Sequence, residues 1–171
     1  QNHTIETDKV GRAQMLLVDG TAFTIGPNSS VTLDRFIYNP ETADGSLEVT
    51  SRGLLRLVGG KVTKKTPAII RTNAATVGIR GGIVIVQTQG QSTKAAFVYG
   101  DQMTVTPTQN ADGETTLTED GFVVTVRNPS DNIEYPDLLT AESLSVLQED
   151  LQAEEKEEES DEDSSDEDSS D

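Results

Sequence analysis

The sequence predicts an all-β fold, a solenoid-like or sandwich-like stack of short strands, followed by one C-terminal amphipathic helix and a disordered acidic tail. Short β-branched and apolar runs recur from about residue 10 to residue 127. Gly, Asn and Asp separate these runs, and they supply the positive backbone dihedrals that tight turns need. Aromatic residues make up only 4% of the chain and Trp is absent, so Val, Ile and Leu must fill a thin core. Short strands with such dense turns indicate an all-β domain.

The expected strands, in chain order, are residues 13–18, 22–25, 30–38, 46–50, 54–58, 68–72, 75–79, 83–88, 93–99, 102–106, 114–118 and 122–127. Residues 30–38 begin as a polar and apolar alternation, which is typical of a strand with one wet face. Residues 83–86 read Ile-Val-Ile-Val. Such a continuous run predicts a strand that is covered on both faces or stacked inside a solenoid.

The character of the chain changes after Pro136, where a helix is expected over residues 140–153. Thr140 is a suitable N-cap, and a stripe at i, i+3 and i+7 follows, formed by Leu144, Leu147 and Leu151. The helix is expected to lie on the β domain, and the alternative is that its leucines bind another subunit. We therefore divide the chain into a β domain over 1–130, a linker and amphipathic helix over 131–153, and a disordered acidic low-complexity tail over 154–171.

Charge is concentrated at the C-terminus. The chain carries 13 Lys and Arg against 30 Asp and Glu, and residues 149–171 hold 14 of these acids but only one base. This balance argues against nucleic acid as a partner, because phosphate binding needs clustered Lys and Arg. The absence of cysteine excludes thiolate chemistry and Cys-based metal sites, and the single histidine leaves no multi-His metal site. No stretch is long and apolar enough for a membrane-spanning helix.

Four short motifs in order carry a family resemblance. They are Asp-Gly-Thr at 19–21, Gly-Pro-Asn-Ser at 26–29, a glycine-led strand from Gly53 that ends in Gly-Lys at 60–61, and Ala-Thr-Val-Gly-Ile-Arg-Gly at 75–81. Over about residues 9–88 the chain resembles the FecR domain of bacterial envelope proteins. Asn73 stands where that family usually has Pro, and Gly82 where it usually has Thr.

The resemblance implies an exported FecR-type β domain, periplasmic or extracellular. The first residue is Gln1 and not Met, so we expect either that a signal peptide was removed before Gln1 or that the chain is a piece of a longer one. Family members that regulate sigma factors carry a cytoplasmic helical segment, a membrane helix and a C-terminal sensor subdomain, and none of these is found in the sequence. The leading hypothesis is therefore a non-enzymatic structural or protein-interaction module of the envelope or extracellular matrix, which binds another component there or assembles with itself. The alternative is the extracytoplasmic part of a FecR-type transmembrane signalling regulator, an anti-sigma system.

Turn and corner residues are the first candidates for a site. We expect architecture from them, at Asp19, Gly20, Gly26, Asn28, Gly78, Arg80 and Gly81. The Gly-rich segment around Arg80 has the composition of an anion cradle, but no helix follows it and no Lys-Ser/Thr completes a phosphate loop. Arg80 is expected to cap carbonyls or to pair with an aspartate such as Asp19. Carboxylates could also form a calcium site, but Asp-Gly turns are the simpler interpretation of these residues, which are Asp19, Asp34, Asp101, Asp112 and Asp120.

A basic cluster and the acidic tail are the remaining candidates. Lys61, Lys64 and Lys65 form the cluster, which could bind an acidic partner but is expected to be a solvated connection. The leucine stripe of the expected helix is the second candidate for partner binding. The tail should attract divalent cations only weakly, and we expect no catalytic residue, no metal site and no other cofactor.

Overall fold

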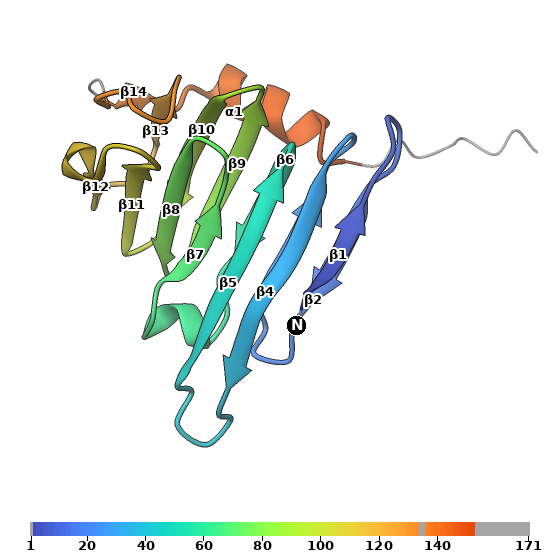
Figure 1. Ribbon diagram of the computed structural model, residues 1–171. Helices are drawn as coiled ribbons and strands as arrows, with labels where there is room; N and C mark the ends of the chain where they lie inside the picture. The colour runs from blue at the N-terminus through green and yellow to red at the C-terminus, as the bar shows by residue number, and fades with distance from the viewer. Residues whose placement is uncertain (1, 134–135, 153–171) are drawn as a thin grey trace, which may run out of the picture.

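The computed structural model describes residues 2–133 and 136–152, and the strands in them form two seven-stranded sheets. Figure 1 shows the sheets packed face to face, as in the sandwich-like alternative. The front sheet runs in the order β1 (His3–Glu6), β4 (Ser30–Tyr38), β5 (Gly45–Arg52), β7 (Ala68–Arg71), β8 (Ala75–Arg80), β11 (Gln102–Pro107) and β12 (Thr115–Leu117). The back sheet runs in the order β14 (Asp137–Leu138), β13 (Phe122–Val126), β10 (Ser92–Tyr99), β9 (Ile83–Gln89), β6 (Leu54–Val58), β3 (Ala22–Ile25) and β2 (Ala13–Leu16).

The core lies between the two sheets and follows the period-two alternation of their strands. Phe23 and Phe97 of the back sheet are at most 1% exposed and are among the largest buried side chains. The front sheet faces them with aliphatic residues such as Leu47, Val77 and Ile79, which are equally buried. The scarcity of aromatic residues thus gives a thin, mainly aliphatic core, as the composition predicts.

The β-branched run of β9 is covered on both faces. Val84 and Val86 belong to the core between the sheets, whereas Ile85 points outward and lies in a second cluster with Leu54 and Ala96. The α-helix α1 (Ala141–Glu149) crosses the outside of the back sheet and covers this cluster (Figure 1). The prediction of a doubly covered strand is confirmed, and a helix provides the second cover.

Three details differ from the sequence-based expectation. The helix ends at Glu149, four residues before the predicted end at 153, and Leu151 lies in the turn that follows. The strands β1 and β14 were not predicted, because each is short and is held by a neighbouring strand: β1 by β4, and β14 by β13. Two 3-10 helices, η1 (Val62–Lys64) and η2 (Ala111–Gly113), interrupt the strands. The predicted disordered tail at 154–171 lies outside the described residues.

Candidate protein-interaction site

The Asp19 turn is an architectural element. Asp19 is 2% exposed, and its carboxylate accepts hydrogen bonds from the Thr21 amide at 3.0 Å, the Thr21 hydroxyl at 2.8 Å and the Val62 amide at 3.2 Å. The Thr21 hydroxyl also accepts from the Gly60 amide at 3.0 Å. One buried carboxylate therefore joins the turn after β2 to the start of η1. Asp19 does not pair with Arg80, contrary to the expectation, because its oxygens point into this buried turn.

The corner after β8 is also occupied by backbone bonds. The Gly81 amide donates to the Thr63 carbonyl at 2.9 Å, and the Gly82 carbonyl accepts from the Gly59 amide at 2.7 Å. The Arg80 carbonyl accepts from the Asp101 amide at 3.1 Å, while the Arg80 side chain is exposed. Since the Gly81 amide is already bonded, the segment does not present the free row of amides that an anion cradle needs.

The other motif residues lie at several places in the sandwich. The Gly26 amide donates to the Leu54 carbonyl at 2.8 Å, and Asn28 adopts a left-handed conformation with φ of 49°. Gly20 has φ of 88° in its turn, and Gly78 lies in the middle of β8. These positions lie in turns and in a strand of the sandwich, and the described contacts give them a structural setting.

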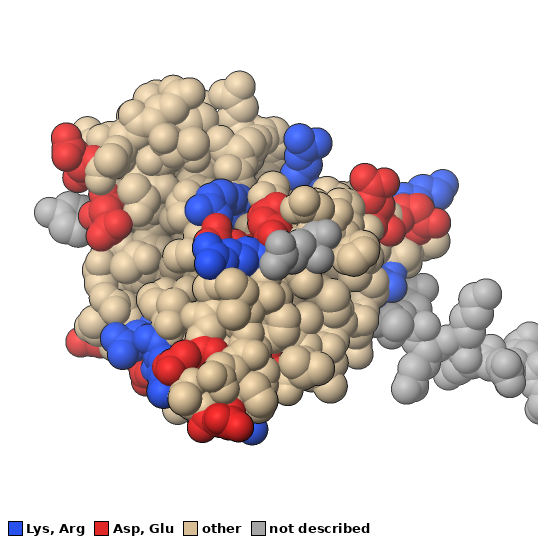
Figure 2. Space-filling model, turned by 60° about the horizontal axis from the view of Figure 1, so that its bottom comes forward, with Lys and Arg blue, Asp and Glu red and all other residues tan. Residues whose placement is uncertain are grey.

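The basic cluster lies at η1 and is partly neutralised. Lys61, Lys64 and Lys65 are exposed, and the Lys65 ammonium lies 3.0 Å from the Asp44 carboxylate. Figure 2 shows this end of the molecule with acidic and basic side chains interspersed and no broad patch of either sign. The three lysines therefore do not form a concentrated anion-binding surface.

The carboxylate of Asp44 provides a test of this pairing. A hydrogen bond from the Thr42 side chain and the contact with Lys65 lower the pKa of Asp44 below its usual value of 3.8. Because the pKa of Asp44 is lowered in the folded state, its contribution to stability is present at a pH above the usual pKa. This contribution is lost as the pH falls through the lowered pKa. An NMR titration of the Asp44 carboxyl carbon should therefore give a midpoint below 3.8. The double variant Thr42→Val, Lys65→Ala should raise that midpoint, and an unchanged midpoint would contradict the assignment.

The leucine stripe faces the chain's own back sheet. Thr140 caps α1, since its hydroxyl accepts a hydrogen bond from the Ser143 amide at 3.2 Å. Leu144 and Leu147 are half-buried and Leu151 is 7% exposed, and all three pack into the cluster beneath the helix. The helix thus lies on the β domain, and the leucines that were candidates for partner binding are used in this intramolecular contact.

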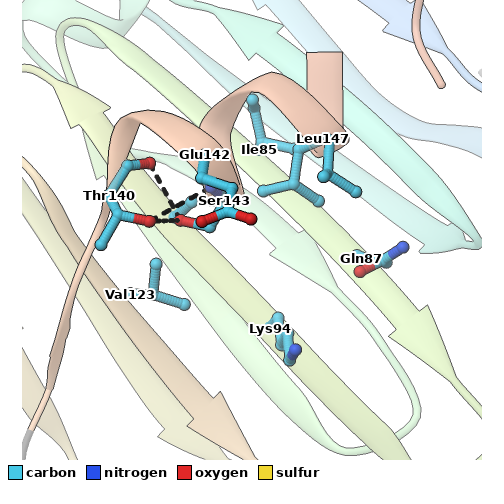
Figure 3. Close-up of a pocket in the computed structure, with 10 residues that line it drawn as sticks. Ile85, Gln87, Lys94, Val123, Thr140, Glu142, Ser143 and Leu147 are labelled. Carbon is cyan, nitrogen blue, oxygen red and sulfur yellow. Dashed lines mark hydrogen bonds between the residues drawn. The ribbon is translucent and has the colours of Figure 1, made fainter. Parts of the chain in front are cut away.

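An open groove remains beside the helix. It has a volume of about 410 Å³ and is lined by Ile85, Gln87, Lys94, Ala96, Val123, Thr140, Glu142, Ser143, Val146 and Leu147. Figure 3 shows Ile85 and Leu147 beneath the helix, whereas Gln87 and Lys94 project from the strands beyond its edge. The floor is apolar and the rim carries one cation and one carboxylate, so the groove is suited to an apolar side chain of a partner.

The contact of α1 with the sheet can be tested by substitution. Leu147→Asp places a charge against Ile85 and should release the helix at a cost of about 1–2 kcal/mol, because it removes the apolar contact of one half-buried leucine. Hydrogen exchange should accelerate over residues 141–149 while the strands of the back sheet stay protected. Val146→Asp is the matched control, since Val146 is already 57% exposed. Equal effects of the two substitutions would contradict the described packing.

Comparison with known proteins places the sandwich in a family. The profile of the family described as "FecR protein" matches residues 3–101, which is more than half of the chain. The chain belongs to the FecR family. The matched region runs from β1 to the end of β10, and it contains the Asp19 turn and the corner after β8. The resemblance that the four motifs indicated is therefore confirmed.

Two solved structures share the fold of this FecR domain. Both are crystal structures of a protein described as a "putative anti-sigma factor" from Parabacteroides distasonis ATCC 8503. One has a TM-score of 0.63 at 17% identity and covers 86% of this chain and 65% of its own. The other has a TM-score of 0.62 at 18% identity and covers 85% of this chain and 64% of its own. The chain thus spans about two thirds of the length of these neighbours, and the likeness shows the fold.

Three further searches, of curated sequences and, in the described part of the chain, of metal-binding groups and of membrane helices, found no match. No curated protein sequence matches the chain. Within residues 2–133 and 136–152, no group of three or more His, Cys, Asp or Glu side chains is placed to hold a metal ion. The helices in that part of the chain are all too short or too polar to cross a membrane.

Proposed function

We propose that this chain is the extracytoplasmic part of a FecR-type transmembrane signalling regulator, an anti-sigma system, and that it acts by binding other proteins without catalysis. The observation that carries the proposal is the FecR match over residues 3–101 on a sandwich that two anti-sigma-type structures share. The alternative of a stand-alone structural module of the envelope has no comparable support. Regulators of this kind transmit a signal through contacts between proteins, so an exposed docking surface matters more than a reaction centre.

The site geometry agrees with a role in protein binding. The buried carboxylate of Asp19 is bonded to three protein donors. The Gly81 amide is bonded as well, so the two motifs with the most suggestive composition serve the fold. The outer face of the back sheet, in contrast, carries a helix and an open groove.

The proposal is tested on the complete gene. We expect its reading frame to encode a cytoplasmic helical segment and a membrane helix in addition to this domain. Asp19→Ala, which is expected to destabilise the domain, should change the transcription of genes served by one sigma factor, measured by RNA sequencing. Asp112→Ala is the control, because Asp112 is an exposed residue of η2. A cleavable signal peptide with no membrane helix, together with unchanged transcription, would overturn the proposal in favour of the structural module.

A further inference from the structure

A row of paired, uncharged residues crosses the back sheet. Leu16, Ala22, Val58, Ile83 and Tyr99 pair in that order across the neighbouring strands β2, β3, β6, β9 and β10. We call these five residues the apolar row. Four of the five point outward because the residues beside them along each strand, such as Phe23, belong to the core between the sheets. Tyr99 lies beyond a bulge and is 63% exposed.

The apolar row has no cover within the described chain. Leu16 is 74% exposed, Tyr99 is 63% exposed, and the three residues between them are half-buried. None of the five belongs to the core between the sheets or to the cluster beneath α1. Val18, two residues after Leu16 in the turn that follows β2, is 84% exposed. The row is thus partly accessible along its length and most exposed at its two ends, and apolar surface that no other element covers marks a site of interaction.

In the neighbouring row on the outer face, the polarity of each residue depends on whether α1 covers it. Its members, from β2 to β13, are Gln14, Thr24, Arg56, Ile85, Ala96 and Val123. The apolar members are the last three, and these lie at the cluster that α1 covers. The first three, on β2, β3 and β6, are polar. In this row the residues are apolar where α1 covers them and polar where it does not. The row beside it is apolar throughout, so we expect that it is covered as well.

The dimensions of the apolar row indicate what covers it. Five neighbouring strands at about 4.8 Å spacing span about 19 Å. An α-helix of about 13 residues has that length, at about 1.5 Å per residue. The row is one residue wide where the next row is polar, so it matches the single apolar stripe of an amphipathic helix. The chain already binds α1 on the same face in this manner.

A second copy of the chain is a poorer occupant. A stable dimer buries about 1,200–2,000 Å² in total, more than a row of five residues provides. Each copy also carries a formal charge of −17, and like charges repel. We therefore propose that the apolar row is the docking site for an amphipathic helix of a partner protein, with apolar residues at i, i+3 or i+4, i+7 and i+11. This rests on the proposed function only in requiring a protein partner.

The experiment begins with a photoreactive side chain. The full chain, with p-benzoylphenylalanine at position 16, is expressed in its own cells and irradiated, and the cross-linked peptide is sequenced by mass spectrometry. Position 138 is the matched control, because Leu138 is 71% exposed on β14, at the opposite edge of the same sheet. We expect a cross-link at position 16 but not at 138, to a segment of another protein with the predicted apolar spacing.

The captured segment is then tested as a synthetic fluorescent peptide. It should become helical on binding to the purified full chain, as seen by circular dichroism. Leu16→Asp and Val58→Asp should each weaken its binding at least tenfold in anisotropy titrations, and Leu138→Asp should leave it unchanged. Leu16 is an exposed edge residue, so its variant folds even if Val58→Asp does not.

Several results would overturn the docking proposal. These are no cross-link at position 16, equal cross-links at 16 and 138, a cross-link to a second copy, or a peptide that binds without forming a helix. The signalling role is read separately, by transcription. If the peptide binds as expected while transcription is unaffected, the proposed function fails and the docking site stands. If transcription responds but no helix docks, the docking proposal fails and the proposed function stands.

Discussion

Replacing Gly82 by threonine should destabilise the domain by about 3–5 kcal/mol, although threonine is the residue that the family usually has at this position. Gly82 has φ of 101°, a conformation that β-branched residues avoid. A Cβ atom at Gly82 would lie 2.0 Å from the Tyr99 carbonyl oxygen and 2.4 Å from the Gly100 Cα. The corner after β8 has therefore closed against the β10–β11 turn to a distance that only glycine allows.

The measurement is urea unfolding of the purified chain, with Gly82→Ala and Gly90→Ala as a matched pair. Gly90 also has a positive φ, of 58°, but a Cβ atom there would have no neighbour within 4 Å. Gly90→Ala should therefore cost only the backbone term of about 1–2 kcal/mol, and Gly82→Ala clearly more. Similar losses in the two variants would show that close packing at Gly82 is unimportant.

Replacing Asp19 by alanine should cost about 3–4 kcal/mol and lower the melting temperature by on the order of 10 °C. The substitution leaves the amides of Thr21 and Val62 and the hydroxyl of Thr21 without their acceptor in a buried turn. Buried donors without a partner carry the full cost of their lost hydration. Asp19→Asn keeps one acceptor oxygen and should lie between alanine and the wild type.

Calorimetry on these variants and on Asp112→Ala gives the comparison. Asp112 also precedes a glycine, but it is exposed, so its replacement should change stability by less than about 0.5 kcal/mol. If Asp19→Ala and Asp112→Ala have the same melting temperature, the Asp19 carboxylate does not hold the two segments together. The Asp-Gly-Thr motif at 19–21 would then be an ordinary surface turn.

The sequence predicts those parts of the fold that depend on near neighbours. Most strand positions follow from β-branched runs and turn residues. The N-cap at Thr140 follows from its hydroxyl, which lies three residues before Ser143 and accepts a hydrogen bond from the Ser143 amide. The strand β1 was missed because His3–Glu6 offers only Ile5 to the core, and its place depends on pairing with β4. Local pattern therefore determines the elements better than it determines their partners.

The candidate site depends on distant pairing and was largely out of reach. The bond from the Val62 amide to Asp19 joins residues 43 positions apart, and the sequence offered Arg80 only as one alternative partner of Asp19. The apolar row requires the registers of five strands, which no local pattern gives. In the sequence its members are separate ordinary strand residues, and only the pairing brings them together.

The connection between β5 and β7 governs how the domain can assemble. These strands are parallel neighbours in the front sheet, yet the chain between them crosses to the back sheet as β6 before it returns. The two halves of the front sheet can therefore join only after β6 has been placed opposite them. Closing that loop costs entropy before any contact repays it, so folding should be slow, on a timescale of milliseconds to seconds. During synthesis, the half formed by β1, β4 and β5 therefore lacks its neighbour β7 until β6 and η1 have emerged.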